Sequence, residues 1–184
     1  TQTLVRAINE EIFKFLVIKH FVYDKKLFAA PIDGIIYAVM ASLGFALVEN
    51  IKFVFDGQIA LVLGYNVMDG YSVALSRMFT AVPMHALAGV MMVYFLGRAK
   101  LSEAEEKQLI FKALGSAALF HTFYNYTSYI TGSYLFLFIV LGFGFYYSKY
   151  LIRDGRLVDK MLEVLSTSEV DSVVPEKPSK QNSN

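Results

Sequence analysis

The chain has 184 residues, enough for one domain, and 55% of them are hydrophobic. Only 18% are charged, whereas soluble domains carry about 25%, and the mean hydropathy is +0.46. The composition therefore indicates a protein embedded in a lipid bilayer. A net charge of +1 gives no support for nucleic-acid binding, and the absence of Cys excludes disulfides, thiolate metal ligands and a cysteine nucleophile.

The first helical run, Leu4–Tyr23, carries charges within an apolar segment: Glu10, Glu11 and Lys14. Each charge near the centre of a membrane helix costs about 2.5–3.5 kcal/mol, so we expect a use for these groups inside a bundle. Neighbouring residues on a helix point about 100° apart. One glutamate should therefore reach a site while the other pairs with Lys14 or another helix. A buried ion pair that only orders the bundle is the alternative.

The second run, Pro31–Phe55, is long enough to span a bilayer and carries Glu49 and Asn50 towards its far end. A loop without Lys or Arg follows over Asp56–Gly70. The third run, Tyr71–Leu96, holds His85 directly after Pro83 and should be kinked there. For Glu49 alone, an interhelical hydrogen bond explains the residue as well as chemistry does.

A capping box at Ser102–Glu105 predicts the start of the fourth helix, which runs to Tyr126. His121 and Asn125 share one face of it. A fifth, almost wholly apolar run covers Tyr134–Ile152 and should face lipid.

These runs predict an all-α, polytopic transmembrane bundle of about five spans over residues 1–153. A short amphipathic cytoplasmic helix over 154–165 and a disordered polar tail over 166–184 should follow. Basic clusters stand in the first, third and last connections and are absent from the other two. Because basic loops stay in the cytoplasm, we expect a cell-membrane protein whose C-terminal tail lies on the cytoplasmic side.

Helix rise then sets the depth of the polar groups. At about 1.5 Å per residue from the cytoplasmic ends, Glu11, His85 and His121 lie about 17–20 Å up. Glu49 and Asn125 lie near 27 Å on the same count. Polar groups from four helices therefore converge between the midplane and the outer leaflet of a core about 30 Å thick, which predicts one site in the extracytoplasmic half.

Carboxylates, imidazoles and an amide at one depth suit hydrolysis in two ways. A glutamate can act as general base on water while His and Asn donate to an oxyanion. Alternatively, a glutamate and two histidines can hold Zn²⁺, for which Glu11, His85 and His121 are the candidate ligands. Buried Glu and His also form ion relays, so a proton- or metal-ion transporter is a further hypothesis.

Four short motifs occur in order along these helices. They are Glu10-Glu11-Ile12-Phe13-Lys14, Gly44-Phe45-Ala46-Leu47-Val48-Glu49-Asn50, Val82-Pro83-Met84-His85 and Phe120-His121-Thr122-Phe123-Tyr124-Asn125. With Asp33-Gly34-Ile35-Ile36-Tyr37, they make residues 6 to 130 resemble the PrsW-type intramembrane proteases, of the wider clan of CAAX prenyl endopeptidases and Abi/CPBP proteins. Phe45 is followed four residues later by Glu49, where the CAAX enzymes have His, so the mechanism of those enzymes does not transfer directly at this position.

The resemblance implies a multi-pass bacterial protease that clips a membrane-anchored protein, typically an anti-sigma factor, on its extracytoplasmic side. The implied roles are water activation by Glu10 and Glu11, completion of a water or metal site by Glu49 and His85, and metal or oxyanion binding by His121 and Asn125. Lys14 and Asn50 would support them. Relatives of this type usually carry further helices before the first motif. A non-catalytic relative that binds another membrane protein is the remaining alternative.

Overall fold

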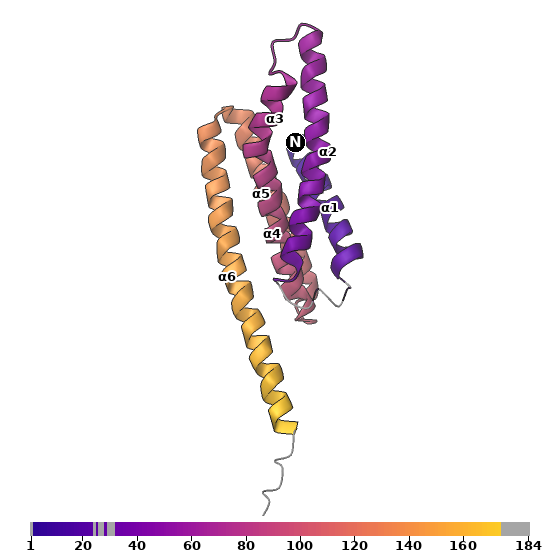
Figure 1. The fold of residues 1–184 in the computed structure, drawn as a ribbon, viewed down its shortest axis with the longest axis vertical. Coiled ribbons are helices and arrows are strands. Elements are labelled where there is room, and N and C mark those ends of the chain that lie inside the picture. Colours follow the sequence, from indigo (N-terminus) through magenta and orange to yellow (C-terminus); the bar gives the residue numbers. More distant parts are fainter. Residues whose placement is uncertain (1, 24, 26–27, 29–31, 174–184) are drawn as a thin grey trace, which may run out of the picture.

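The computed structural model describes residues 2–23, 25, 28 and 32–173, and within them the chain is helical and contains no strand. The elements in order are α1 Gln2–Ile18, a π-helical turn at Lys19–Tyr23, α2 Gly34–Val62, α3 Gly70–Phe79, α4 Ala81–Lys100, α5 Glu106–Thr131 and α6 Tyr134–Val173 (Figure 1). Three stretches are long and apolar enough to cross a membrane: Gly34–Val62, Gly70–Lys100 and Tyr134–Leu165. The protein is therefore a helical membrane bundle, as its composition indicates. The count of five spans stays a prediction.

Helix α4 is the core of the bundle, and most of its length is buried against α2, α5 and α6. Small residues allow this close approach, as is common between membrane helices. At Gly89, an added Cβ would lie 2.4 Å from Ser42 Oγ and 3.0 Å from the carbonyl oxygen of Ala38, both on α2. The contact between α2 and α4 therefore requires glycine at this position.

Helix α1 presents one buried stripe to the bundle. Ala7, Glu11, Lys14 and Ile18 are each fully buried and follow one another at intervals of four, three and four residues. This spacing places them on a single helix face, which packs on α5 and α2. Two of the four are charged, so the centre of the interface is polar.

The third predicted helix bends, but the bend lies before the proline. Helix α3 ends at Phe79 and α4 begins at Ala81, with Thr80 between them in a non-helical conformation. A proline ring clashes with the carbonyl group four residues earlier, which for Pro83 is that of Phe79. Thr80 stabilises the break because its hydroxyl donates to the carbonyl oxygen of Ser76 at 2.7 Å.

Two other helix boundaries differ from the sequence-based expectation. Helix α2 continues through the first part of the predicted loop to Val62, because the apolar residues before Gly64 sustain it and Gly64 then turns the chain with a positive φ of 85°. The predicted capping box was wrong: α5 begins at Glu106, and no side chain caps its first turn. Residues after Lys100 form turns instead.

Helix α6 passes without a break through the predicted boundary near residue 153 and through the amphipathic stretch. In Figure 1 its C-terminal part extends beyond the other helices, whereas the α2–α3 connection extends beyond them at the other end. The predicted tail begins as helix up to Val173, and its remainder, 174–184, lies outside the described residues. The apolar and charged segments of α6 are thus parts of one long helix.

Candidate functional site

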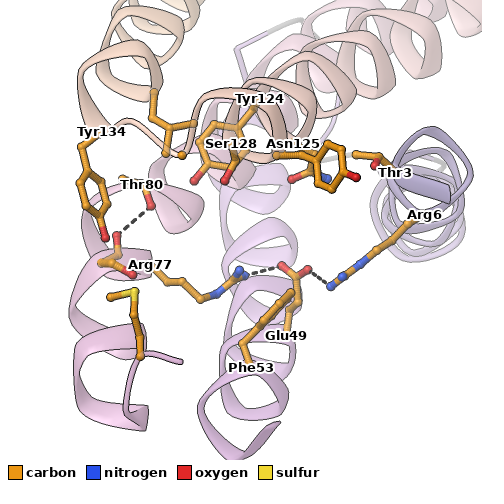
Figure 2. A pocket seen from close by; sticks show the side chains of 15 residues that line it. Thr3, Arg6, Glu49, Phe53, Arg77, Thr80, Tyr124, Asn125, Ser128 and Tyr134 are labelled. Carbon is orange, nitrogen blue, oxygen red and sulfur yellow. Dashed lines mark hydrogen bonds and ion pairs between the residues drawn. The ribbon is translucent and has the colours of Figure 1, made fainter. Parts of the chain in front are cut away.

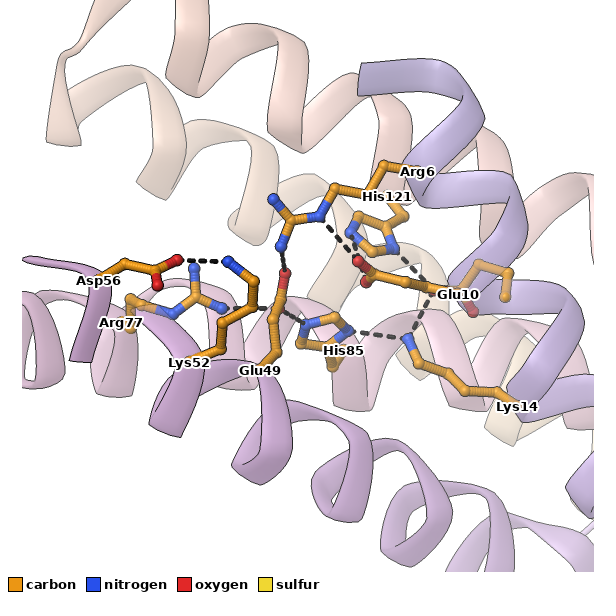
Figure 3. Close-up of polar contacts among 10 residues, drawn as sticks. Arg6, Glu10, Lys14, Glu49, Lys52, Asp56, Arg77, His85 and His121 are labelled. Atoms are coloured by element: carbon orange, nitrogen blue, oxygen red, sulfur yellow. Dashed lines mark hydrogen bonds and ion pairs between the residues drawn. The ribbon is translucent and has the colours of Figure 1, made fainter. Parts of the chain in front are cut away.

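Lys14 lies fully buried at the centre of a polar cluster to which α1, α2, α4 and α5 contribute. Its ammonium nitrogen donates to Glu11 Oε1 at 2.6 Å and lies 2.8 Å from His85 Nδ1 on α4. Figure 3 shows the lysine reaching from α1 towards the imidazole. Since an ammonium group has no acceptor, His85 Nδ1 must accept this hydrogen bond. The ring therefore carries its proton on Nε2, which lies 2.9 Å from Glu49 Oε2 and donates to it.

His121 on α5 has the opposite arrangement. Its Nδ1 lies 2.7 Å from Glu11 Oε1 and donates to it, so in the neutral ring Nε2 offers a lone pair. That Nε2 faces Glu10 Oε2 at 3.7 Å. Glu10 Oε2 is itself buried and has no hydrogen-bond partner among the described residues. Glu11 thus orients His121, whereas Glu10 and His121 leave a carboxylate oxygen and an imidazole nitrogen facing one another.

Glu49 on α2 is held by arginines from two directions. Arg6 of α1 bonds Glu49 Oε1, and Arg77 of α3 donates to Glu49 Oε2 at 2.6 Å (Figures 2 and 3). The Arg77 Nε also donates to Asn50 Oδ1 at 2.6 Å. Both guanidinium groups lie over the ring of Phe53, at 4.8 Å for Arg6 and 4.1 Å for Arg77. Glu49 and its neighbours therefore fix both arginines.

A cleft of about 620 Å³ opens directly over this arginine pair. Figure 2 shows Glu49, Arg6 and Arg77 on one side, and Tyr124, Asn125 and other α5 side chains across from them. No hydrogen bond within the described part of the chain engages the Asn125 amide, so its donor and acceptor are available to a bound molecule. The cleft combines an apolar and aromatic wall with hydrogen-bond donors at its base.

Three neighbouring side chains of the polar cluster have the composition of a metal site. Ligand atoms of Glu10, His85 and His121 all lie within 4.8 Å of one another. Two imidazoles and a carboxylate with an open position are a hydrolytic zinc set, and such ligands lie about 3.4 Å apart in a tetrahedral complex. The free lone pair of His121 and the unpartnered Glu10 Oε2 fit this use. To join them through Nε2, His85 would lose that proton to water and take at Nδ1 the proton that Lys14 donates, which would leave the lysine neutral.

The structure brings most of the sequence-predicted site residues into one network. Glu10, Glu11, Lys14, Glu49, His85 and His121 are joined by direct contacts, and Asn50 is linked through Arg77. Asn125 lies one turn beyond His121, on the wall of the cleft. The expected metal ligands were Glu11 and the two histidines, but the group that lies together holds Glu10 instead. Glu11 is engaged by Lys14 and His121 through its Oε1.

Neither Arg6 nor Arg77 was among the site residues predicted from the sequence. One signal for Arg6 existed, because it stands four residues before Glu10 on the same helix and their side chains bond at 3.0 Å. For Arg77 no local signal exists, since its partners lie on a different helix, 27 and 28 residues away in the chain.

Comparison with known proteins agrees with the motifs. A family model described as PrsW family intramembrane metalloprotease matches residues 1–148. Protease PrsW of Halalkalibacterium halodurans is 34% identical over 134 residues, which cover 73% of this chain and 56% of that protein. Protease PrsW of Oceanobacillus iheyensis is 35% identical over 120 residues, 65% of this chain and 50% of that protein.

Protease PrsW of Bacillus subtilis is 36% identical over 93 residues, 50% of this chain and 37% of that protein. The chain thus spans about half the length of the curated relatives it matches. No solved structure matches it. With a family model covering most of its length, and with that family's motifs gathered in one polar cluster, the chain belongs to the PrsW family of intramembrane metalloproteases.

Proposed function

We propose that this protein is an intramembrane endopeptidase that hydrolyses a peptide bond of a membrane-anchored protein. The observation that carries the proposal is the meeting of Glu10, His85 and His121 in one cluster, which His85 joins to Glu49 on the wall of the cleft. Family membership supports the same reaction. A proton relay would need polar groups in a ladder across the membrane, whereas these groups cluster at one level.

The residues of the cluster divide into two groups. Glu10, His85 and His121 would hold a metal ion, for which Zn²⁺ is the candidate because two imidazoles and a carboxylate suit it. When bound, such an ion supplies Lewis acidity to a carbonyl group and to water. Glu11 and Lys14 position the two imidazoles by bonding their Nδ1 atoms. Metal-binding histidines usually donate their second ring N–H to a carboxylate or carbonyl group, as His121 does to Glu11.

Glu49 and the cleft residues then act on the substrate. Once His85 Nε2 is directed towards an ion, Glu49 Oε2 loses one of its two donors and can accept a proton from water. Arg6 and Arg77 hold that carboxylate in place. The Asn125 amide stands on the opposite wall, where it can donate to the oxyanion of the scissile carbonyl.

The proposal extends to substrate and orientation. Basic clusters at alternate connections support a C-terminal end in the cytoplasm of a cell membrane and a cleft towards the extracytoplasmic half. The motif resemblance supports a substrate of the anti-sigma-factor type, anchored by one span. The polar cluster is buried among helices, so the bond to be cut has to enter the cleft from the membrane or its outer surface.

The test is cleavage of a single-span membrane protein by the full protein in proteoliposomes. Glu10→Gln and His121→Ala should each lower the rate by about 10²-fold or more. Glu103→Gln, in the exposed turn before α5, removes one carboxylate elsewhere and should cleave like the parent. Parent-like cleavage by the Glu10 and His121 variants would overturn the proposal. The proposal would also be overturned if the protein cleaved no substrate but carried a proton or metal flux that required Glu49.

A further inference from the structure

Helix α6 carries a basic stripe at the end of its apolar segment. Lys149, Arg153, Arg156 and Lys160 follow at intervals of four, three and four residues and so lie on one helix face. None of the four forms an ion pair with a described carboxylate. About 20 residues of helix cross the hydrocarbon core, and counting from Tyr134 places its boundary near Arg153. The stripe therefore lies at the membrane–water interface.

These four residues line a groove of about 700 Å³ between α6 and α4. The groove also contains Ser148, which is 3% exposed and whose Oγ has no hydrogen-bond partner among the described residues. The nearby acidic group of Asp154 is bonded to Tyr94 and Arg98 of α4 and lies off the stripe. A hydroxyl donor and several cations are thus available to an anion in the groove.

The groove continues into the membrane as an apolar track. A second hollow of about 410 Å³ shares Leu87 and Phe145 with the first and is otherwise lined by Pro83, Ala86, Phe138, Leu141 and Gly142. Phe138, Gly142 and Phe145 precede Lys149 on the same face of α6. From Phe138 to Arg153 the helix rises about 22 Å. A charged end and an apolar track of this length together match one lipid molecule.

We propose that the α4–α6 groove binds an anionic phospholipid. The phosphate accepts hydrogen bonds from the arginines and from Ser148, and one acyl chain lies along the track past Leu87 and Gly142. A transmembrane helix fits less well, because its apolar surface would leave the four cations and the Ser148 hydroxyl without an anionic partner. The groove shares no lining residue with the cleft over Glu49, so this inference is independent of the protease proposal.

The experiment is native mass spectrometry of the full chain in detergent with equal amounts of phosphatidylglycerol and phosphatidylcholine. The parent should retain phosphatidylglycerol, the anionic lipid, in preference to phosphatidylcholine. Each basic residue near an anionic lipid strengthens binding about fivefold, so Arg153→Gln with Arg156→Gln should weaken retention about 25-fold. Lys107→Gln with Lys112→Gln removes two exposed charges from α5 instead and should leave retention unchanged.

A second pair of variants tests the acyl track without altering charge. Gly142→Leu should also reduce retention, because its side chain fills the track while an added Cβ meets no atom within 4 Å. Gly115→Leu, equally open on α5, is the matched control. Equal retention of both lipids, or parent-like retention by the arginine variant, overturns the inference. If glycerol 3-phosphate displaced the bound lipid and Gly142→Leu retained phosphatidylglycerol like the parent, the groove would be a site for a free anion. That result would also overturn the inference.

Discussion

Replacing Lys14 by methionine tests whether the buried network depends on its one lysine. The change removes two charge-assisted hydrogen bonds, to Glu11 Oε1 at 2.6 Å and to His85 Nδ1 at 2.8 Å. It leaves the carboxylate of Glu11, itself fully buried, with only His121 as a partner. Removing one member of a buried ion pair costs about 3–5 kcal/mol. Because methionine restores apolar packing and His121 stays in place, we expect about 3 kcal/mol, at the lower end of that range.

The assay is reversible unfolding in mixed micelles, followed by helicity. Lys112→Met, on the exposed face of α5, should change the unfolding free energy by less than about 0.5 kcal/mol. Combining Lys14→Met with Glu11→Gln should cost less than the two changes added together, by about 1–3 kcal/mol, because residues in one network couple. A loss below about 1 kcal/mol for Lys14→Met, or strict additivity in the double variant, would refute the reasoning.

Three further predictions follow from other parts of the structure. Gly89→Ala should destabilise the protein by about 1–3 kcal/mol because its Cβ would lie 2.4 Å from Ser42 Oγ, whereas Gly115→Ala, which meets nothing, should be neutral or slightly stabilising in the same unfolding assay. Asn125→Ala should lower kcat for peptide cleavage about 10²-fold with parent-like unfolding; an unchanged kcat would contradict an oxyanion role. Arg77→Lys should also slow cleavage, because one ammonium nitrogen does not reproduce the planar fork by which the guanidinium bonds Asn50 through Nε and Glu49 through Nη2; full activity would show that charge alone suffices.

The helical class, and the meeting of buried charged and histidine side chains, could be predicted from the sequence because both follow from the cost of placing charges in apolar helices. Charged residues within apolar runs, such as Glu11 and Lys14, are conspicuous at any helix depth. Depth counting brought His85 and His121 to one level, and their ring centroids lie 5.0 Å apart. It placed Glu49 about 9 Å further out than His85, yet the two side chains are in contact. Helix tilt and the length of a glutamate side chain cover the difference.

The division of labour between the two glutamates could not be predicted from their order in the chain. It depends on helix rotation, which packing against α5 sets: the buried stripe contains Glu11, and Glu10 stands beside it, bonded to Arg6 and facing His121. The roles of the arginines were hidden for a similar reason, because Arg6 and Arg77 meet Glu49 only in three dimensions. The predicted helix ends were wrong where local signals compete. Before Glu106, for example, the capping-box residues make no capping hydrogen bond.

The central claim is that Glu10, His85 and His121 hold a metal ion used in peptide hydrolysis. Its most direct test is the metal content of the purified full protein, measured together with cleavage before and after chelation. We expect about one zinc ion per chain in the parent. His121→Ala should lose both the metal and cleavage, and cleavage should return when zinc is added back to the chelated parent. Parent-rate cleavage by protein shown to be free of metal would contradict it.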